Sequence, residues 1–226
     1  MVENMRRILI FIAGFIFSIT SSLAQVPVRD EPRHRVALEN EYIRLLDVRL
    51  APGDTSLFHV HEIPSFFIPL STTAIGSQVQ GQAAKESRFA ADSTWYNEFE
   101  TGPLVHRVWN SDTSLLHVID LELLSRKNSV LPDIVELASF KIAFENSRLR
   151  VYKFELSSQR HISVPALRAP ALFISVTGPA TIITKPVKNL SYTVQQGGFQ
   201  WLESRDKFDI RNKEPGAVNA ILILLK

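Results

Sequence analysis

The sequence predicts an all-β protein built from two tandem β-barrels. Short runs rich in Val, Ile, Leu and Phe alternate with turn residues throughout residues 25–226, and one pattern of residues occurs twice. Many short strands separated by turn signals are typical of sandwiches and barrels, and two copies of one pattern indicate two such units. Helical periodicity over a dozen residues occurs only before residue 25.

The first 24 residues have the pattern of a secretory signal peptide. Arg6 and Arg7 precede an uncharged apolar run over residues 8–20, and Ser-Leu-Ala at 22–24 places small residues where signal peptidase reads them. The run is shorter than the ~20 residues of a bilayer span, which favours cleavage over a membrane anchor. We therefore expect export to the periplasm or the outside of the cell, with Gln25 as the mature N-terminus and no membrane attachment afterwards.

The expected strands follow a similar pattern in both copies. In the first copy they fall at residues 42–50, 57–61, 66–70 and 115–124. In the second copy they fall at residues 148–156, 171–177, 181–184 and 217–225. A polar connector around residues 125–133 separates them, so we expect domains at 25–126 and 127–226.

The two copies align without gaps over more than thirty residues at an offset of 106. This register superimposes the following pairs: Glu39 on Glu145, Arg44 on Arg150, Pro64 on Pro170 and Trp95 on Trp201. The offset falls to 102 where Asn110 meets Asn212. Because both copies keep them, we expect the Glu/Arg pairs to be structural ion pairs and the two tryptophans to be packing residues.

The amino-acid composition limits the kinds of functional site that the chain can form. The 226 residues are 45% hydrophobic and 21% charged with a formal net charge of +2, which is typical of a globular protein and gives no basic surface for nucleic acid. The absence of cysteine excludes disulfides, a thiol nucleophile and cysteine-ligated metals. No nucleophile elbow, Walker loop or dinucleotide-binding fingerprint is present. Any metal site must therefore use His, Asp or Glu.

Three histidines of the first copy have the spacing of a metal site. His59 and His61 are two residues apart on an expected strand, so their side chains point to the same face. His106 opens a second stretch that ends in Asn110. Imidazole nitrogens that converge on that face can hold a metal at about 2.0–2.2 Å.

These two stretches resemble the motifs of the cupin superfamily, whose members are small jelly-roll barrels. Gly53, His59 and His61 match the first motif, G-x5-H-x-H-x3/4-E, and His106 with Asn110 matches the H-x3-N of the second. The glutamate of the first motif is missing, since its permitted positions hold Ser65 and Phe66, and Glu62 is expected on the opposite face. The glycine of the second motif is displaced to Gly102. The resemblance implies two tandem cupin-type jelly-roll barrels, a bicupin.

The second copy lacks the histidines. In register, His59 is replaced by Pro165, His61 by Leu167 and His106 by Phe208. Because the twin is expected to fold without these histidines, they are more consistent with a function than with packing. His34 lies in a charged stretch and is expected to be solvated.

The resemblance implies a divalent transition metal, Fe, Mn, Ni, Cu or Zn, held by His59, His61 and His106. It implies a dioxygenase-type oxidoreductase acting on a small organic molecule, because cupins with three histidines and no glutamate occur among dioxygenases. The alternative is a non-catalytic barrel that binds a small molecule or a sugar. Ser65 and His117 are candidates for contacting substrate or supporting the metal ligands from outside, and association as a homodimer is a further expectation.

Overall fold

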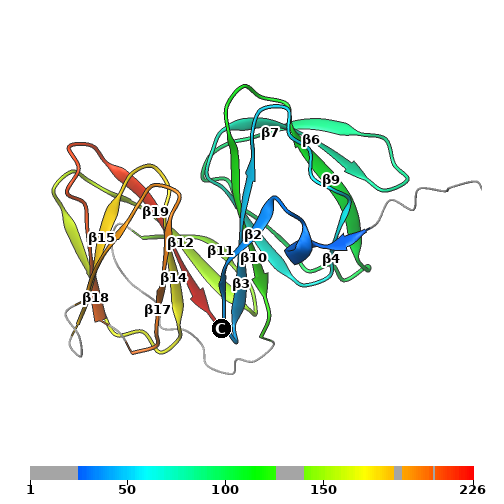
Figure 1. Ribbon diagram of the computed structural model, residues 1–226. Helices are drawn as coiled ribbons and strands as arrows, with labels where there is room; N and C mark the ends of the chain where they lie inside the picture. The colour runs from blue at the N-terminus through cyan, green and yellow to red at the C-terminus, as the bar shows by residue number, and fades with distance from the viewer. Residues whose placement is uncertain (1–24, 126–139, 186–189, 206) are drawn as a thin grey trace, which may run out of the picture.

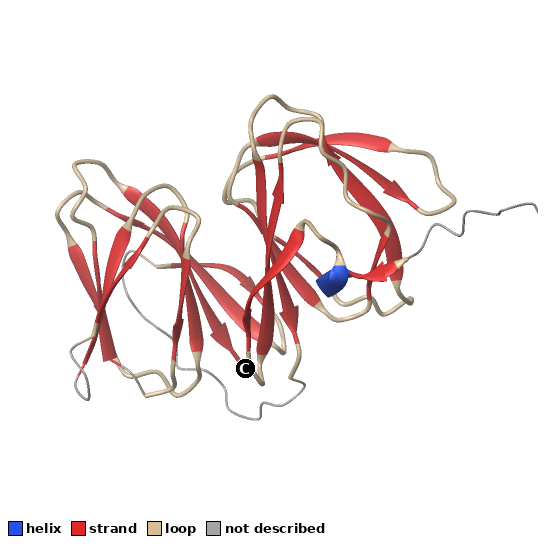
Figure 2. Cartoon of the chain, viewed as in Figure 1, coloured by secondary structure: helices blue, strands red, loops and turns tan. Residues whose placement is uncertain are grey.

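The computed structural model describes residues 25–125, 140–185, 190–205 and 207–226, which form two β-barrels side by side (Figures 1 and 2). The expected signal peptide and most of the expected connector lie outside the described residues. The one helical element among the described residues is a 3-10 turn, η1 (Val28–Asp30). No helix in this part of the chain is long and apolar enough to cross a membrane.

The first barrel consists of two five-stranded sheets. One sheet has the order β1-β4-β9-β6-β7, formed by β1 (Val26–Pro27), β4 (His59–His61), β9 (Leu104–Asn110), β6 (Thr73–Val79) and β7 (Lys85–Phe89). The other has the order β2-β3-β10-β5-β8, formed by β2 (His34–Glu39), β3 (Ile43–Leu50), β10 (Leu116–Leu123), β5 (Ser65–Pro69) and β8 (Trp95–Asn97). Apart from the parallel pair β1–β4, the strands pair antiparallel.

The second barrel repeats this topology. Its five-stranded sheet has the order β11-β12-β19-β14-β17, formed by β11 (Lys141–Glu145), β12 (Leu149–Leu156), β19 (Val218–Leu225), β14 (Ala171–Ser175) and β17 (Phe199–Leu202). Its four-stranded sheet has the order β13-β18-β15-β16, formed by β13 (His161–Val164), β18 (Lys207–Arg211), β15 (Ala180–Lys185) and β16 (Ser191–Val194). The all-β fold of two tandem barrels is therefore confirmed.

The turns that the repeat superimposes are equivalent in detail. The Asn110 side-chain amide donates to the carbonyls of Leu50 and Ser114 at 2.9 and 2.7 Å, and the Asn212 amide donates to Leu156 and Gly216, both at 2.8 Å. Both asparagines are buried, so each satisfies backbone carbonyls that would otherwise lack a partner. These asparagines hold the strand ends together in both barrels.

The expected Glu/Arg ion pairs are also present twice. Arg44 Nε lies 2.8 Å from Glu39, and Arg150 Nη2 lies 2.6 Å from Glu145. Arg44 makes a further bond of 2.5 Å to buried Glu122 on β10. The pairs link neighbouring strands, β2 with β3 and β11 with β12, and are confirmed as structural.

One five-stranded sheet of each barrel, β2-β3-β10-β5-β8 and β11-β12-β19-β14-β17, packs against the other between the barrels. Alternate residues of β10 and β19 point into this contact, while the residues between them point into the barrel interiors. The contact is made by equivalent residues of the two copies: Ile43 and Leu149, Leu45 and Val151, Ile68 and Ile174, Ile119 and Ile221, Leu121 and Ile223. Trp201 stacks on Tyr42 at its edge. The same face of each barrel therefore forms one shared apolar core.

Candidate metal centre

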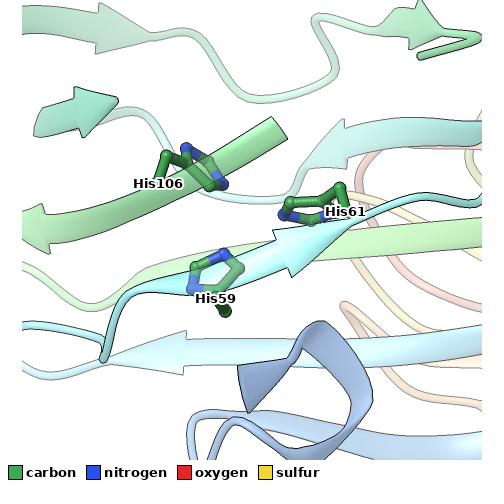
Figure 3. A group of neighbouring side chains, drawn as sticks. All are labelled: His59, His61 and His106. Carbon is green, nitrogen blue, oxygen red and sulfur yellow. The ribbon is translucent and has the colours of Figure 1, made fainter. Parts of the chain in front are cut away.

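The three histidines of the two motifs meet inside the first barrel. β4 carries His59 and His61, and the neighbouring strand β9 carries His106 directly opposite His59 (Figure 3). One ring nitrogen of each histidine can be chosen so that all three lie within 4.8 Å of one another. The period-2 geometry of β4 aims its two imidazoles inward, as the sequence predicts.

The environment keeps these imidazoles neutral. Burial, with the neighbouring His34 and His106, lowers the pKa of His59 to about 3, and burial beside His34 lowers the pKa of His106 to about 4. Burial and the adjacent histidines also lower the pKa of His61 well below its ordinary range. At neutral pH each ring therefore keeps an unprotonated nitrogen with a lone pair.

The ring nitrogens of the triad that have no hydrogen-bond partner are suited to binding a metal. His59 Nδ1 donates to the Leu57 carbonyl at 2.9 Å, which leaves Nε2 as the nitrogen with the lone pair. His59 Nε2, His61 Nδ1 and His106 Nε2 are buried without a hydrogen-bond partner among the described residues. Buried polar atoms without partners are costly in a folded protein, and a divalent cation would satisfy a cluster of them.

A carboxylate that the sequence analysis missed lies beside His61. Asp120 Oδ2 on β10 is 3.6 Å from His61 Nδ1, and Asp120 is fully buried. Burial, together with the neighbouring Glu122, raises its pKa well above the ordinary range, and Ser65 offsets this in part. At 3.6 Å, Asp120 forms no hydrogen bond with His61, so either ring nitrogen of His61 can serve as the ligand, depending on its tautomer. Carboxylates beside metal-binding histidines commonly orient them, and Asp120 is the group placed to do so when a metal binds.

His34 is buried beside the triad, so the expectation that it is solvated is wrong. Its ring lies 4.5 Å from the His59 ring, centroid to centroid, and its Nδ1 lies 2.6 Å from Glu31 Oε2. Glu31 also accepts from the backbone amides of Arg33 and Leu57 at 2.7 and 3.1 Å. Burial opposes the ionised form of Glu31, but these bonds and His34 outweigh it and lower its pKa. Glu31 and His34 thus form a buried pair, while Arg29, Asp30 and Arg35 of the same stretch are exposed.

The triad opens into a cavity of about 170 Å³ in the barrel interior. Besides the three histidines, the cavity is lined by His34, Asp120 and the aromatic side chains of Phe67, Phe89 and Trp95. Trp95 stacks on Phe67 at 4.9 Å and 12°. Trp95 therefore faces the cavity as well as packing, unlike its twin Trp201 between the barrels.

The structure does not bring the other two candidate residues into the cavity wall. Ser65 is buried beside Asp120, and its hydroxyl donates to the Ile63 carbonyl at 2.9 Å. His117 points away from the cavity, because it alternates with the inward-facing Leu116 and Val118 of β10. Its Nε2 lies 2.8 Å from Asp47, and its ring approaches Gly197 of the second barrel. Glu62, the residue after β4, is exposed to solvent.

Apolar residues replace the triad in the second barrel. Phe208, at the place of His106, lies in its apolar core, and so does Leu167, which the gapless alignment puts opposite His61. The partner of Phe208 across the strands is Val164, not Pro165, whereas His106 pairs with His59. Thr55 bridges Trp109 in the first barrel, and His161 pairs with Arg211 at the equivalent place in the second. From Thr55 to His59 the first barrel therefore has one more residue than the second has from His161 to Val164. That insertion makes the gapless register wrong by one residue at this point.

Solved structures match this chain in fold. No family model and no curated protein matches its sequence. AerE from Microcystis aeruginosa has a TM-score of 0.58 at 14% identity, over 87% of this chain and 98% of that one. A cupin 2 conserved barrel domain protein from Leptotrichia buccalis has a TM-score of 0.52 at 10% identity, over 84% and 86%. Salicylate 1,2-dioxygenase from Pseudaminobacter salicylatoxidans has a TM-score of 0.57 at 9% identity, over 81% and 71%.

These likenesses establish the fold. The chain has the two-domain cupin fold, a bicupin, as its motifs and internal repeat predict. At such identities the similarity extends to architecture only, so the function must be argued from the cavity and its residues.

Proposed function

We propose that the first barrel binds one divalent transition metal through His59, His61 and His106 and acts as a dioxygenase-type oxidoreductase on a small organic substrate. The observation that carries this proposal is the set of three neutral imidazoles with unpartnered nitrogens at the wall of the barrel cavity. The oxidative assignment is supported by the dioxygenase among the proteins of the same fold.

Residues around the triad orient its imidazoles and form an apolar wall around the substrate. When bound, the metal supplies a Lewis acid and, for iron or copper, a redox centre for reactions with dioxygen. The Leu57 carbonyl fixes the His59 tautomer, and Asp120 faces Nδ1 of His61. The apolar wall excludes water from the substrate, which strengthens polar interactions inside the cavity.

Metal binding can be tested directly. The mature protein is stripped with a chelator, reconstituted separately with Fe(II), Mn(II), Ni(II), Cu(II) and Zn(II), and subjected to elemental analysis. We expect one metal per chain, lost in His59→Ala and in His106→Ala. His161→Ala is the matched control, because His161 is exposed on β13 of the second barrel. Unchanged metal content in the two triad variants would refute the proposal.

The oxidative step needs its own assay. With the metal that binds, oxygen uptake is followed while a panel of small hydroxylated and diketone compounds is supplied. We expect uptake that matches substrate loss and disappears in His106→Ala. Substrate turnover without oxygen uptake would leave the metal site but exclude dioxygenase chemistry.

A non-catalytic binding barrel is the second candidate. It is favoured by the missing motif glutamate, whose two permitted positions hold Ser65 and Phe66. This candidate predicts that a bound small molecule raises the melting temperature equally with and without chelator. A chelator-dependent rise would count against it and for the metalloenzyme.

We also propose that the protein is exported. The support is the charged start and apolar run of residues 1–24. N-terminal sequencing of the protein recovered from the periplasm or medium should begin at Gln25. Recovery of the uncleaved chain from the cytoplasm would refute export.

A further inference from the structure

Most of the cavity wall away from the histidines is apolar. It is built from Val48, Ile75, Val108, Leu116 and Val118, with two serines, Ser77 and Ser87, beside them. Ser87 is exposed on β7, so the cavity reaches solvent there. A ligand with many polar groups, such as a sugar, would leave most of them without partners inside, which is costly.

One side of the cavity is aromatic. Trp95 stacks on Phe67 at 4.9 Å and contacts Phe89 at 4.8 Å, and Phe67 in turn meets His61 edge to face at 5.8 Å. All four rings border the cavity. Rings arranged in this way offer flat faces and edges to a flat ligand, and such contacts add to the effect of apolar burial.

His34 supplies a fixed polar group at the histidine end. Glu31 holds His34 Nδ1 at 2.6 Å, and this carboxylate is itself anchored by the amides of Arg33 and Leu57. His34 lines the cavity, and its Nε2 makes no hydrogen bond to another described residue. An imidazole oriented by a buried carboxylate presents its second nitrogen to a ligand at a defined position.

The charge of the cavity limits how many anionic groups a ligand can carry. Among the described residues, no Lys or Arg lines the cavity. A divalent metal held by three neutral imidazoles would supply positive charge at the histidine end and so balance anionic oxygens there. A second negative charge at the far end would meet only apolar and aromatic side chains, and burying it without a partner is strongly unfavourable.

We propose that this cavity takes a small, flat molecule with an apolar body and a single oxygen-bearing head, and that His34 hydrogen-bonds that head. The inference rests on the proposed function in placing the head beside the metal triad. It adds the class of ligand and a ligand-contacting residue. The body lies against Phe67 and Trp95, and the head faces His34 and the triad.

Matched probes test the ligand class. Binding of phenol, toluene, 4-hydroxybenzoate and glucose is measured by calorimetry on metal-free and on zinc-loaded protein. We expect phenol to bind at least about tenfold more tightly than 4-hydroxybenzoate, which differs by a carboxylate at the far end. We expect phenol to exceed toluene by about threefold or more, because toluene lacks the hydroxyl. Binding of 4-hydroxybenzoate or glucose as tight as that of phenol would overturn the proposed class.

Variants test His34. His34→Phe keeps a flat ring but removes both nitrogens, so the phenol-to-toluene affinity ratio should fall about threefold while toluene affinity and zinc content stay unchanged. Should this variant not fold, Glu31→Gln removes the charge that holds His34 and should lower the same ratio. His161→Phe is the control and should leave the ratio unchanged. An unchanged ratio in the folded variant would overturn the role of His34.

The measurements on metal-free and on zinc-loaded protein separate this inference from the proposed function. Protein that takes up neither zinc nor any of the other four metals refutes the metal site, but the metal-free measurements still decide the ligand class. Protein that takes up zinc and prefers 4-hydroxybenzoate keeps the metal site and loses the ligand class.

Discussion

Lowering the pH from 7 to 5 should destabilise the metal-free protein, because the buried triad resists protonation in the folded state. A histidine in an unfolded chain titrates near pH 6.5. In the folded protein the pKa of His59 is lowered to about 3 and that of His106 to about 4. Between these values the unfolded chain binds more protons, so stability is full above pH 6.5 and falls as the pH falls.

The size of the effect follows from these shifts. At pH 5, about 1.5 units below the unfolded pKa, each of His59 and His106 costs about 2 kcal/mol, or about 4 kcal/mol together. His61 acts in the same direction, whereas buried Asp120 opposes it, because the folded state keeps a proton that the unfolded chain releases. A loss of about 4 kcal/mol is a large share of the stability of an ordinary domain.

The assay is urea unfolding at pH 7, 6 and 5 in the presence of a chelator, followed by tryptophan fluorescence. The informative variant combines His59→Val with His106→Phe, which installs the residues of the second barrel, Val164 and Phe208, at the paired positions. It should lose most of the acid sensitivity. His161→Gln, an exposed change, should keep it.

Two results would refute this reasoning. One is a free energy of unfolding in the metal-free protein that does not change between pH 7 and 5. The other is a double variant with the same acid sensitivity as the parent, which would place the responsible protons elsewhere.

Four further substitutions have expected outcomes. Asp120→Asn should weaken metal affinity about 10–100-fold in competition with a coloured chelator, because it alters the partner facing His61 Nδ1; unchanged affinity would contradict this. Asn110→Ala and Asn212→Ala should each cost about 2–3 kcal/mol in urea unfolding, since each removes two buried bonds to carbonyls; a cost in one barrel only would contradict their equivalence. Gly197→Ala should cost about 1–3 kcal/mol by thermal unfolding, because φ is +73° and the new Cβ would lie 2.7 Å from the His117 ring; a neutral change would refute this contact.

The sequence predicts those features that depend on strand periodicity and short spacing. His59 and His61 share a face because strand side chains alternate, and the repeated Asn110 and Asn212 follow from an alignment that tolerates one deletion. The gapless register fails at Pro165 because the first copy has one more residue between Thr55 and His59, and a single insertion there does not change the β-like composition of either copy.

Contacts between distant strands are harder to predict. Asp120 and His34 reach the triad from β10 and β2, which are neighbours of β4 only in space. A signal for both was present, because the alignment replaces Asp120 by Leu222 and His34 by Phe140, and both replacements pack into the second barrel's core. A polar residue that aligns with a core residue of the other copy is expected to point into the barrel. A comparison restricted to the motif residues does not include such positions.

The face shared by the two barrels bears on how copies of the chain can associate. Equivalent residues such as Leu121 and Ile223 meet there, which is how a two-fold symmetric dimer interface is built. Here the two halves of one polypeptide supply both sides, and the face is already covered. A homodimer of the whole chain would therefore have to use another surface. Because the two barrels of one chain have different sequences, unlike the subunits of a homodimer, the interior of the second barrel can be filled with apolar side chains while the first barrel keeps its histidines.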